Sequence, residues 1–272
     1  METIMNHKFL SDNEFGQKGT YSIVLPIDQG VEHGPFAAFL NTEHPEMLDV
    51  EYQTDYINEL LNEGLVSATA LPARTASVLL KKYPEQAGNI ITKHNHSNNL
   101  NKDLEPNQWQ HTRRLWRKVG ALGWTIYPGS TNQAEQTAGF LFEKAVIPEK
   151  KTVLWSYPRG GDFDETSLET IMHAAYIAAQ LEPDVIKVKL PTSNYEKAQV
   201  DNVRNIVKAA CGIPVLFSGG SKKDEESVLN DAKAIAKGGG LGMIIGRNVF
   251  QRPPKDAKNL LNKIHKIFGD VK

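Results

Sequence analysis

Residues 167–191 read SLETIMHAAYIAAQLEPDVIKVKLP, and they contain a helical pattern followed directly by a strand pattern. The helical spacing is carried by four apolar residues, Leu168, Ile171, Met172 and Ala175. Glu182-Pro183 ends this pattern, because the residue before a proline is disfavoured in a helix. The run that follows is short, rich in β-branched residues and alternating, as a strand is. The stretch therefore predicts a helix that leads into a strand.

Runs of this strand type recur along the whole chain, and most are separated by stretches with helical periodicity. The eight runs are residues 20–28, 66–72, 89–95, 122–129, 151–158, 184–191, 213–220 and 240–248. Successive parallel strands need a crossover helix between them, so eight β/α units predict a closed barrel. We therefore expect an α/β fold, a single-domain TIM (β/α)8 barrel over residues 1–272. An open doubly wound sheet is the alternative, but no G-x-G-x-x-G follows the first strand.

The bulk composition shows no strong net charge. The 272 residues include 31 Lys and Arg against 32 Asp and Glu, so no overall field attracts nucleic acid or an anionic membrane. Cys211 is the only cysteine, which excludes an intrachain disulfide, and we expect it to be a small packed residue. Residues 1–16 lack the apolar region of a secretory signal, and no run approaches the roughly 20 apolar residues of a membrane span. We expect a cytoplasmic protein.

Residues 96–118 depart from the simple pattern, because they are polar and Asn-rich at first and then basic with two tryptophans. We interpret this segment as a loop followed by the third helix of the barrel. An oligomer contact through Trp109 or Trp116 is the alternative, and the sequence does not decide between them.

The sixth run carries two lysines at strand spacing. Ile186, Val188 and Leu190 form an apolar face suited to the helix layer, which turns Lys187 and Lys189 toward the barrel interior. Burial and a neighbouring like charge both lower the pKa of a lysine, by as much as ~3 to 5 units for a fully buried group. The neutral amine that results can attack a ketone carbonyl. A single strand lysine would more often reach the rim or pair with an acid, but two in tandem favour a nucleophile.

The first run supplies an acid at the same end of the barrel. Ile23, Leu25 and Ile27 face the helices, so Asp28 points inward where the strand ends. Asp28 could pair with a lysine ammonium or orient a substrate hydroxyl, and a helix cap or turn residue is an equally good interpretation. His33 is a further candidate at the rim, on weaker grounds.

The fifth run ends in aromatic residues. Trp155 and Tyr157 share one face of the strand, and Arg159 lies on the loop that follows. A phenol at a strand end can act as a general acid/base, and the indole can form a wall of a site, although buried aromatic residues are usually core. A guanidinium at the position of Arg159 is well placed to bind a phosphate.

Two glycine motifs close the seventh and eighth runs. Ser218-Gly219-Gly220 ends the seventh run and Gly246-Arg247-Asn248 ends the eighth. Loops in these two places often build the phosphate site of a barrel, since glycines let backbone N–H groups approach the phosphate oxygens. Either motif alone would be an ordinary turn, but together they predict a phosphate site.

Three histidines offer a metal-dependent alternative. His94 and His96 follow the third strand, and with His33 they could hold a zinc ion that polarises a ketone. Strand alternation puts His94 and His96 on the face opposite Lys93, which argues against this site. Lys93 is the residue expected to point inward, as electrostatic support.

Taken together, these residues resemble the archaeal-type class I fructose-bisphosphate aldolases, a branch of the Schiff-base TIM-barrel aldolases that includes bacterial members. The resemblance covers nearly the whole chain. Six ordered blocks carry it: LPIDQGVEHGP at 25–35, TIYPGS at 125–130, LWSYPRGG at 154–161, IKVK at 186–189, PVLFSGG at 214–220 and IGRNVFQR at 245–252.

The resemblance implies a role for each matching residue. Lys187, the first lysine of IKVK, forms the Schiff base, Tyr157 is the general acid/base beside Trp155, and Asp28 is the acid of the first block. The residues expected to contact phosphates are Arg159, Ser218, Gly219, Gly220, Gly246 and Arg247, and Lys189 and His33 are candidates for substrate binding. No metal or other cofactor is implied.

The resemblance also implies a sugar phosphate substrate, fructose 1,6-bisphosphate, and a large homo-oligomer such as a ring-based decamer. Related barrels use the same lysine-bearing strand for other keto-phosphate reactions, including a transaldolase-like synthesis and a thiolysis, so the substrate stays open. A barrel that binds sugar phosphates without catalysis is a further alternative. Gln29 stands where the first block often has histidine, and residues 96–118 look longer than in compact members.

Overall fold

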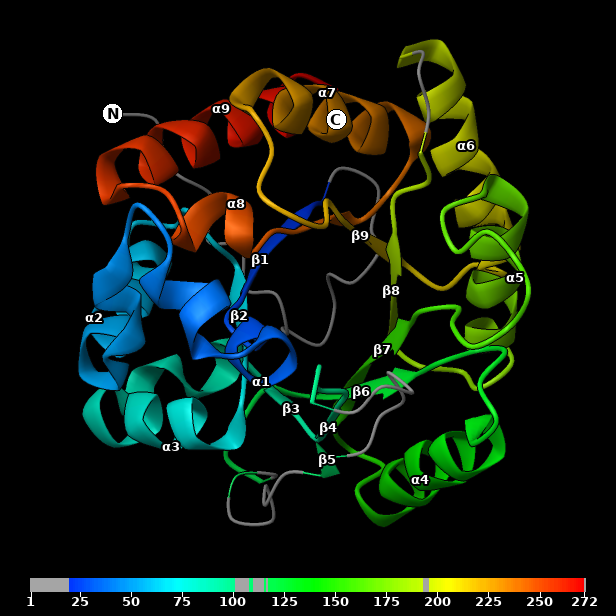
Figure 1. The fold of residues 1–272 in the computed structure, drawn as a ribbon, viewed down its shortest axis with the longest axis horizontal. Helices are drawn as coiled ribbons and strands as arrows, with labels where there is room; N and C mark the ends of the chain where they lie inside the picture. Colours follow the sequence, from blue (N-terminus) through cyan, green and yellow to red (C-terminus); the bar gives the residue numbers. More distant parts are fainter. Residues whose placement is uncertain (1–19, 101–107, 110–114, 116, 193–195, 272) are drawn as a thin grey trace.

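Eight parallel strands form a closed barrel in the computed structural model, which describes residues 20–100, 108–109, 115, 117–192 and 196–271 (Figure 1). The barrel strands are β1 (Ser22–Pro26), β2 (Ala68–Leu71), β3 (Ile90–Lys93), β6 (Ala121–Ile126), β7 (Lys151–Ser156), β8 (Val185–Lys189), β9 (Val215–Ser218) and β10 (Gly242–Ile244). Their order around the barrel is β1-β10-β9-β8-β7-β6-β3-β2. All eight predicted strand runs are confirmed, and the doubly wound alternative is wrong.

Helices surround this barrel in Figure 1, and shorter helices lie at its mouth. The long helices are α2 (Val50–Asn62), α3 (Ala73–Lys82), α4 (Gln133–Val146), α5 (Leu168–Ala179), α6 (Glu196–Ala209), α7 (Glu225–Gly238) and α9 (Pro254–Val271). The short elements are α1 (Gln29–His33), α8 (Arg247–Phe250), a π-helical turn at Phe36–Leu40, and 3-10 turns at Pro45–Leu48 and Pro84–Asn89. Helix α5 confirms the helix predicted from residues 167–181, and its first turn is capped by the Ser167 side chain.

The barrel strands lie between two apolar layers, an outer one against the helices and an inner one that fills the barrel. These layers determine which side chains point into the barrel. Ile186 and Val188 of β8 belong to the outer layer between the strands and the helices. Val185 and Trp155 belong to the inner cluster that fills the barrel. Because successive side chains alternate between these layers, the phase predicted for Lys187 on β8 is confirmed.

The barrel closes where its first strand meets its last. Ser22 of β1 pairs with Gly242 of β10. A Cβ atom at Gly242 would lie 1.8 Å from the Ser22 carbonyl oxygen, so the two backbones approach more closely than any side chain at this position allows. Gly242 is therefore needed for the last pairing of the barrel.

The segment predicted as a loop and third helix has a different structure in its described part. Two short strands, β4 (Asn95–His96) and β5 (Gln108–Trp109), pair antiparallel, and residues 115 and 117–118 are in a turn. Within the described residues of 96–118 no helix forms, so the helix prediction is wrong for that part. Residues 101–107, 110–114 and 116 lie outside the described residues, as does the contact suggested for the Trp109 and Trp116 side chains.

Two other expectations concern the surface. Cys211 was expected to pack inside, but it is exposed after α6 with a φ of 53°, so that prediction is wrong. In the described part of the chain, no helix combines the length and the apolar character needed to cross a membrane.

Candidate active site

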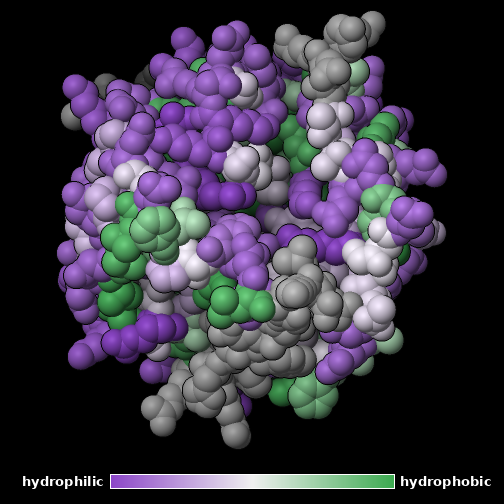
Figure 2. Space-filling view, viewed as in Figure 1, coloured by the Kyte–Doolittle hydropathy of each residue, from purple (hydrophilic) through white to green (hydrophobic). Residues whose placement is uncertain are grey.

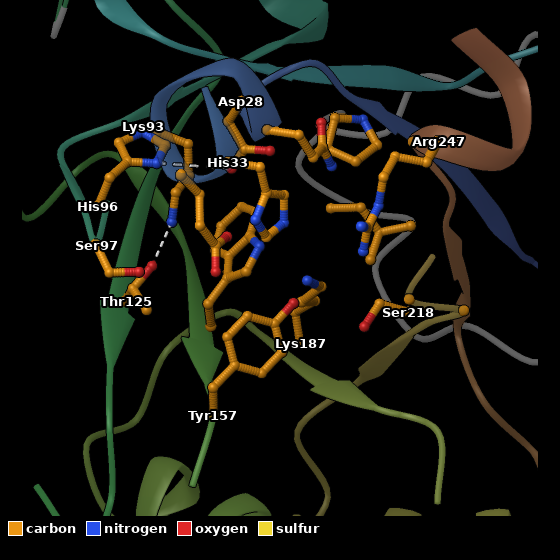
Figure 3. A pocket seen from close by; sticks show the side chains of 18 of the residues that line it. Asp28, His33, Lys93, His96, Ser97, Thr125, Tyr157, Lys187, Ser218 and Arg247 are labelled. Carbon is orange, nitrogen blue, oxygen red and sulfur yellow. Dashed lines mark hydrogen bonds and ion pairs between the residues drawn. The ribbon is translucent and has the colours of Figure 1, made fainter. Parts of the chain in front are cut away.

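A cavity opens at the carboxyl ends of the barrel strands, where the sequence predicts the site. Residues of α1 and α8 contribute to its wall together with the ends of the strands. Hydrophilic side chains surround the central opening on this face of the molecule (Figure 2). Figure 3 shows Asp28, Lys93, Tyr157, Lys187 and Arg247 converging on this space from different elements.

Lys187 lies deep in the cavity on β8. Its side chain is buried, and its Nζ lies 4.2 Å from the centre of the Tyr157 ring and 5.8 Å from that of Trp155. Burial lowers the pKa of Lys187 to about 7, with Asp28 opposing the shift and Lys93 adding to it. A substantial share of the amine is therefore neutral near pH 7, as a nucleophile must be.

A second lysine, Lys93, reaches the same cavity from the end of β3, as predicted. It is only 1% exposed, donates a hydrogen bond of 2.5 Å to Thr125 Oγ1, and lies 3.9 Å from the centre of the Trp155 ring. Burial lowers the pKa of Lys93 to about 8, against the attraction of Asp28. A Cβ atom at Gly123 would lie 2.8 Å from the Trp155 ring and 3.0 Å from Lys93, so this stacked pair needs the glycine of β6.

Asp28 lines the same cavity as these two amines. It occupies the N-cap position of α1, but its side chain makes no capping hydrogen bond, so the capping interpretation does not describe its role. Burial raises the pKa of Asp28, and the charges of Lys93 and Lys187 oppose that rise. The three groups form one buried charge cluster in which each protonation state depends on the others.

The phosphate motifs lie together on the other side of the cavity. Ser218, Gly219 and Gly220 end β9, and Gly246 and Arg247 follow β10; all five line the cavity wall. Gly220 has a φ of 73°, which favours glycine. At Gly246 a Cβ atom would lie 2.7 Å from the Gln29 side chain and 2.8 Å from the Pro26 carbonyl oxygen, so glycine is needed there for space.

Arg247 and Asn248 have contrasting surroundings. Arg247 points toward the cavity in Figure 3, its Nε is buried without a hydrogen-bond partner among the described residues, and burial lowers its pKa. Asn248 donates a hydrogen bond to the Ser221 carbonyl oxygen and accepts one from the backbone N–H of Lys223. It thereby ties the loop after β9 to α8. The sequence reasoning gave Asn248 no role of its own, although it belongs to the same motif as Arg247.

Arg159 does not line the cavity, in contrast to what its loop position suggested. It donates a hydrogen bond of 3.0 Å to Glu32 Oε1, and its guanidinium carbon lies 4.6 Å from the centre of the Tyr127 ring. Burial alone would raise the pKa of Glu32, but Arg159 and His33 together lower it. Glu32 and Tyr127, which do line the cavity, were missed by the sequence reasoning, although both lie within quoted blocks.

The remaining candidates lie at the rim. Lys189 also stays off the cavity wall: its Nζ is 3.2 Å from Glu165 Oε2 and 5.7 Å from the centre of the Tyr157 ring. His33 lines the cavity as expected, and burial lowers its pKa. Trp155 and Tyr157 line it from β7 and the residue that follows the strand.

The predicted orientation is correct for His94 and wrong for His96. His94 lies away from the cavity, with its Nδ1 3.7 Å from Glu143 Oε1 on α4. His96 lines the cavity, because β3 ends at Lys93 and His96 belongs to β4, which pairs with β5 outside the barrel, so the alternation of β3 does not continue to His96. Among the described residues no group of three or more His, Cys, Asp or Glu side chains has the arrangement of a metal site.

Known proteins resemble this chain in sequence and in structure. Residues 22–252 match the family model described as DeoC/LacD family aldolase. The class 1 fructose-bisphosphate aldolase of Thermoproteus tenax is 32% identical over 91% of this chain and 89% of that protein. The enzyme of the same name from Halobacterium salinarum is 32% identical over 85% of this chain and 84% of that protein.

A solved structure has the same fold. It is an archaeal fructose-1,6-bisphosphate aldolase with its catalytic lysine covalently bound to the carbinolamine intermediate of the substrate. That chain is 30% identical, superposes with a TM-score of 0.77, and is similar over 97% of this chain and 99% of its own length.

Proposed function

Because this chain belongs to the DeoC/LacD aldolase family, we propose that it cleaves fructose 1,6-bisphosphate reversibly, as a class I aldolase with a Schiff base on Lys187. The products are dihydroxyacetone phosphate and glyceraldehyde 3-phosphate. The observation that carries the proposal is a buried lysine with a pKa of about 7 at the end of a barrel strand, facing Tyr157 and a glycine-rich phosphate cradle.

The first step is attack of the neutral Lys187 amine on the C2 ketone. A carbinolamine forms, and it loses water to give the iminium ion. Asp28 and Lys93 support this step, because they set the charge around the amine without reacting themselves.

Cleavage of the C3–C4 bond needs a base for the C4 hydroxyl proton. Tyr157 is assigned this role, since it lines the cavity and its ring centre lies 4.2 Å from Lys187 Nζ. The electron pair of the broken bond moves into the iminium and leaves an enamine. Tyr157 then returns the proton to C3, and hydrolysis frees dihydroxyacetone phosphate together with the original amine.

The phosphate of the dihydroxyacetone half is assigned to the cradle of Ser218, Gly219, Gly220, Gly246 and Arg247. Arg159 is assigned to the second phosphate. Arg159 is paired with Glu32. To bind the phosphate, the guanidinium either leaves Glu32 or binds the phosphate and the carboxylate at the same time, with Glu32 holding it near the rim.

Borohydride trapping followed by mass spectrometry tests this function. Borohydride reduces an iminium ion to a stable secondary amine, so the wild-type protein incubated with fructose 1,6-bisphosphate should carry an adduct on the peptide containing Lys187. The same experiment with a panel of other ketose phosphates distinguishes the related keto-phosphate reactions, because an enzyme of each type should form the adduct with its own substrate. A protein that binds these ligands but never forms an adduct would be a non-catalytic binding barrel.

Metal removal should leave the rate of cleavage unchanged, because the iminium ion accepts the electron pair that a zinc ion would otherwise stabilise. The measurement is the cleavage rate before and after exhaustive dialysis against EDTA. Loss of activity that zinc restores would contradict the Schiff-base mechanism.

Arg247→Ala should weaken substrate binding with a smaller effect on kcat. A charge-assisted contact to phosphate is worth ~1.5 to 3 kcal/mol, so KM should rise by about one to two orders of magnitude. Arg204→Ala is the matched control, since Arg204 lies on α6 in an exposed pair with Asp201 and its loss removes the same charge elsewhere. An unchanged KM in Arg247→Ala would remove Arg247 from the phosphate site.

The homo-oligomer and the cytoplasmic location expected from the sequence stay predictions. Exposed apolar side chains on α4 support an oligomer: Leu141, Phe142 and Val146 are 45%, 67% and 51% exposed. Such a group of side chains is typical of a surface that another copy of the chain covers.

A further inference from the structure

His96 enters the cavity from β4, which pairs with β5, and not from a barrel strand. The side chain of Asn95 fastens β4 to β6: its Nδ2 donates to the Thr125 carbonyl oxygen at 2.8 Å, and its Oδ1 accepts from the Thr125 N–H at 2.7 Å. These are the two bonds that a strand backbone would make, so Asn95 extends the pairing of the sheet by one position with its side chain. His96, the next residue, is thereby directed toward the cavity.

The ring of His96 faces Asp28. Its Nδ1 lies 4.0 Å from Asp28 Oδ2, and Figure 3 shows the two side chains opposite each other beside Lys93. The imidazole is 5% exposed, and its Nε2 is buried without a partner among the described residues. Burial and the neighbouring Lys93 hold the pKa of His96 well below its usual value, so the ring is neutral and carries a single N–H.

Asp28 is surrounded by groups that act on its charge in opposite directions. Lys93 on β3 and Lys187 on β8 favour the carboxylate, whereas burial and Glu32 on α1 favour the protonated acid. When Lys187 is the neutral amine that the reaction needs, one of the two favourable charges is lost. The carboxylate then depends more strongly on any other donor that faces it.

We propose that His96 is a positioning residue that presents its Nδ1–H to Asp28 and keeps this carboxylate ionised while Lys187 is neutral. The separation of 4.0 Å is longer than a hydrogen bond, and a rotation that brings the groups about 1 Å closer makes one. The inference rests on the proposed function, because it states that the aldolase is active when Asp28 is ionised.

Three substitutions separate a hydrogen-bonding role from a packing role. His96→Leu removes both ring nitrogens, His96→Asn places an amide nitrogen where Nδ1 was, and His96→Gln places one where Nε2 was. The measurement is the pH dependence of kcat/KM for fructose 1,6-bisphosphate. The Lys187 amine also titrates on the acid side of this profile, so the acid limb compared here is the break that is lost in Asp28→Asn. In His96→Leu the acid limb should move to higher pH by about one unit, the shift that corresponds to one hydrogen bond to an ionised group.

His96→Asn should keep the acid limb close to that of the wild type, while His96→Gln should move with His96→Leu. The direction follows from the loss of a donor, because a less stabilised carboxylate is protonated at a higher pH. An acid limb that does not move in His96→Leu, that moves to lower pH, or that moves equally in His96→Leu and His96→Asn would overturn the inference. If His96→Leu does not fold, the comparison of His96→Asn with His96→Gln decides.

Borohydride labelling distinguishes a failure of this inference from a failure of the proposed function. All three variants should still form the adduct on Lys187, because His96 does not react. If the wild-type protein forms no such adduct, the proposed function fails. If the wild type is labelled and active but the acid limbs of the variants coincide, only the role of His96 fails.

Discussion

Lys187→Ala should abolish both cleavage of fructose 1,6-bisphosphate and the adduct trapped by borohydride. Lys187 is the buried amine closest to neutral at pH 7, and its Nζ lies against the Tyr157 ring. Without an amine at the C2 carbonyl no iminium ion forms to accept the electron pair of the C3–C4 bond, so the rate gained by covalent catalysis is lost. The measurement is turnover in a coupled assay together with mass spectrometry of the reduced protein.

Lys189→Met is the matched control for this substitution. Lys189 is on the same strand and the same face, but its ammonium is paired with Glu165 and stays off the cavity wall. This variant should keep measurable turnover and the adduct on Lys187. Its pH optimum should become slightly more alkaline, because Lys189 lowers the pKa of Lys187, but less than burial and Lys93 do. Borohydride labelling of Lys189 or Lys93 in the wild type would mean that the nucleophile is misassigned.

Tyr157→Phe should separate adduct formation from bond cleavage. The substitution keeps the ring beside Lys187 and removes the hydroxyl, so the iminium ion should still form and be trapped. Turnover should fall by roughly 10²- to 10⁴-fold, the usual effect of losing a general acid/base. Single-turnover trapping and steady-state kinetics on the same preparation provide the comparison.

Tyr127→Phe is the control for that experiment. Tyr127 also lines the cavity, but its hydroxyl is hydrogen-bonded to Ser97 at 2.7 Å, and burial raises its pKa to about 12. It is therefore a poor proton donor to the substrate, and its loss should change turnover much less. A larger loss in Tyr127→Phe than in Tyr157→Phe would exchange the roles of the two phenols.

The barrel and the main part of the site could be predicted because both follow from strand alternation. Lys187 and Trp155 lie on the predicted side of their strands, since the helix layer fixes which face is apolar, and Asp28 follows the same phase because Ile27, just after β1, still packs in the outer layer. The same rule failed at His96, because it was extended past Lys93, where β3 ends. Alternation is a safe guide only while the chain stays in the strand, and nothing in the residue types around His94 marks the end of β3.

The ion-pair partners of the site residues could not be predicted from the sequence either. The sequence predicts a phosphate contact for Arg159 from its residue type and its loop, and this stays a proposal, but the sequence does not reveal the ion pair of Arg159 with Glu32 from a different β/α unit. For Lys189, likewise, the sequence does not reveal the ion pair with Glu165. Such pairs join residues far apart in the chain, so neither periodicity nor a local motif identifies them.

The seam between β1 and β10 has a consequence for how the chain matures. Ser22 and Gly242 lie about 220 residues apart, so a nascent chain leaving the ribosome carries its first strand with one edge open until the last strand has been synthesised. Closure over such a sequence separation is entropically slow compared with the local β/α pairings. The loop with Gly246 and Arg247 follows β10 directly, so we expect the ability to bind phosphate to arise last, at the moment of ring closure.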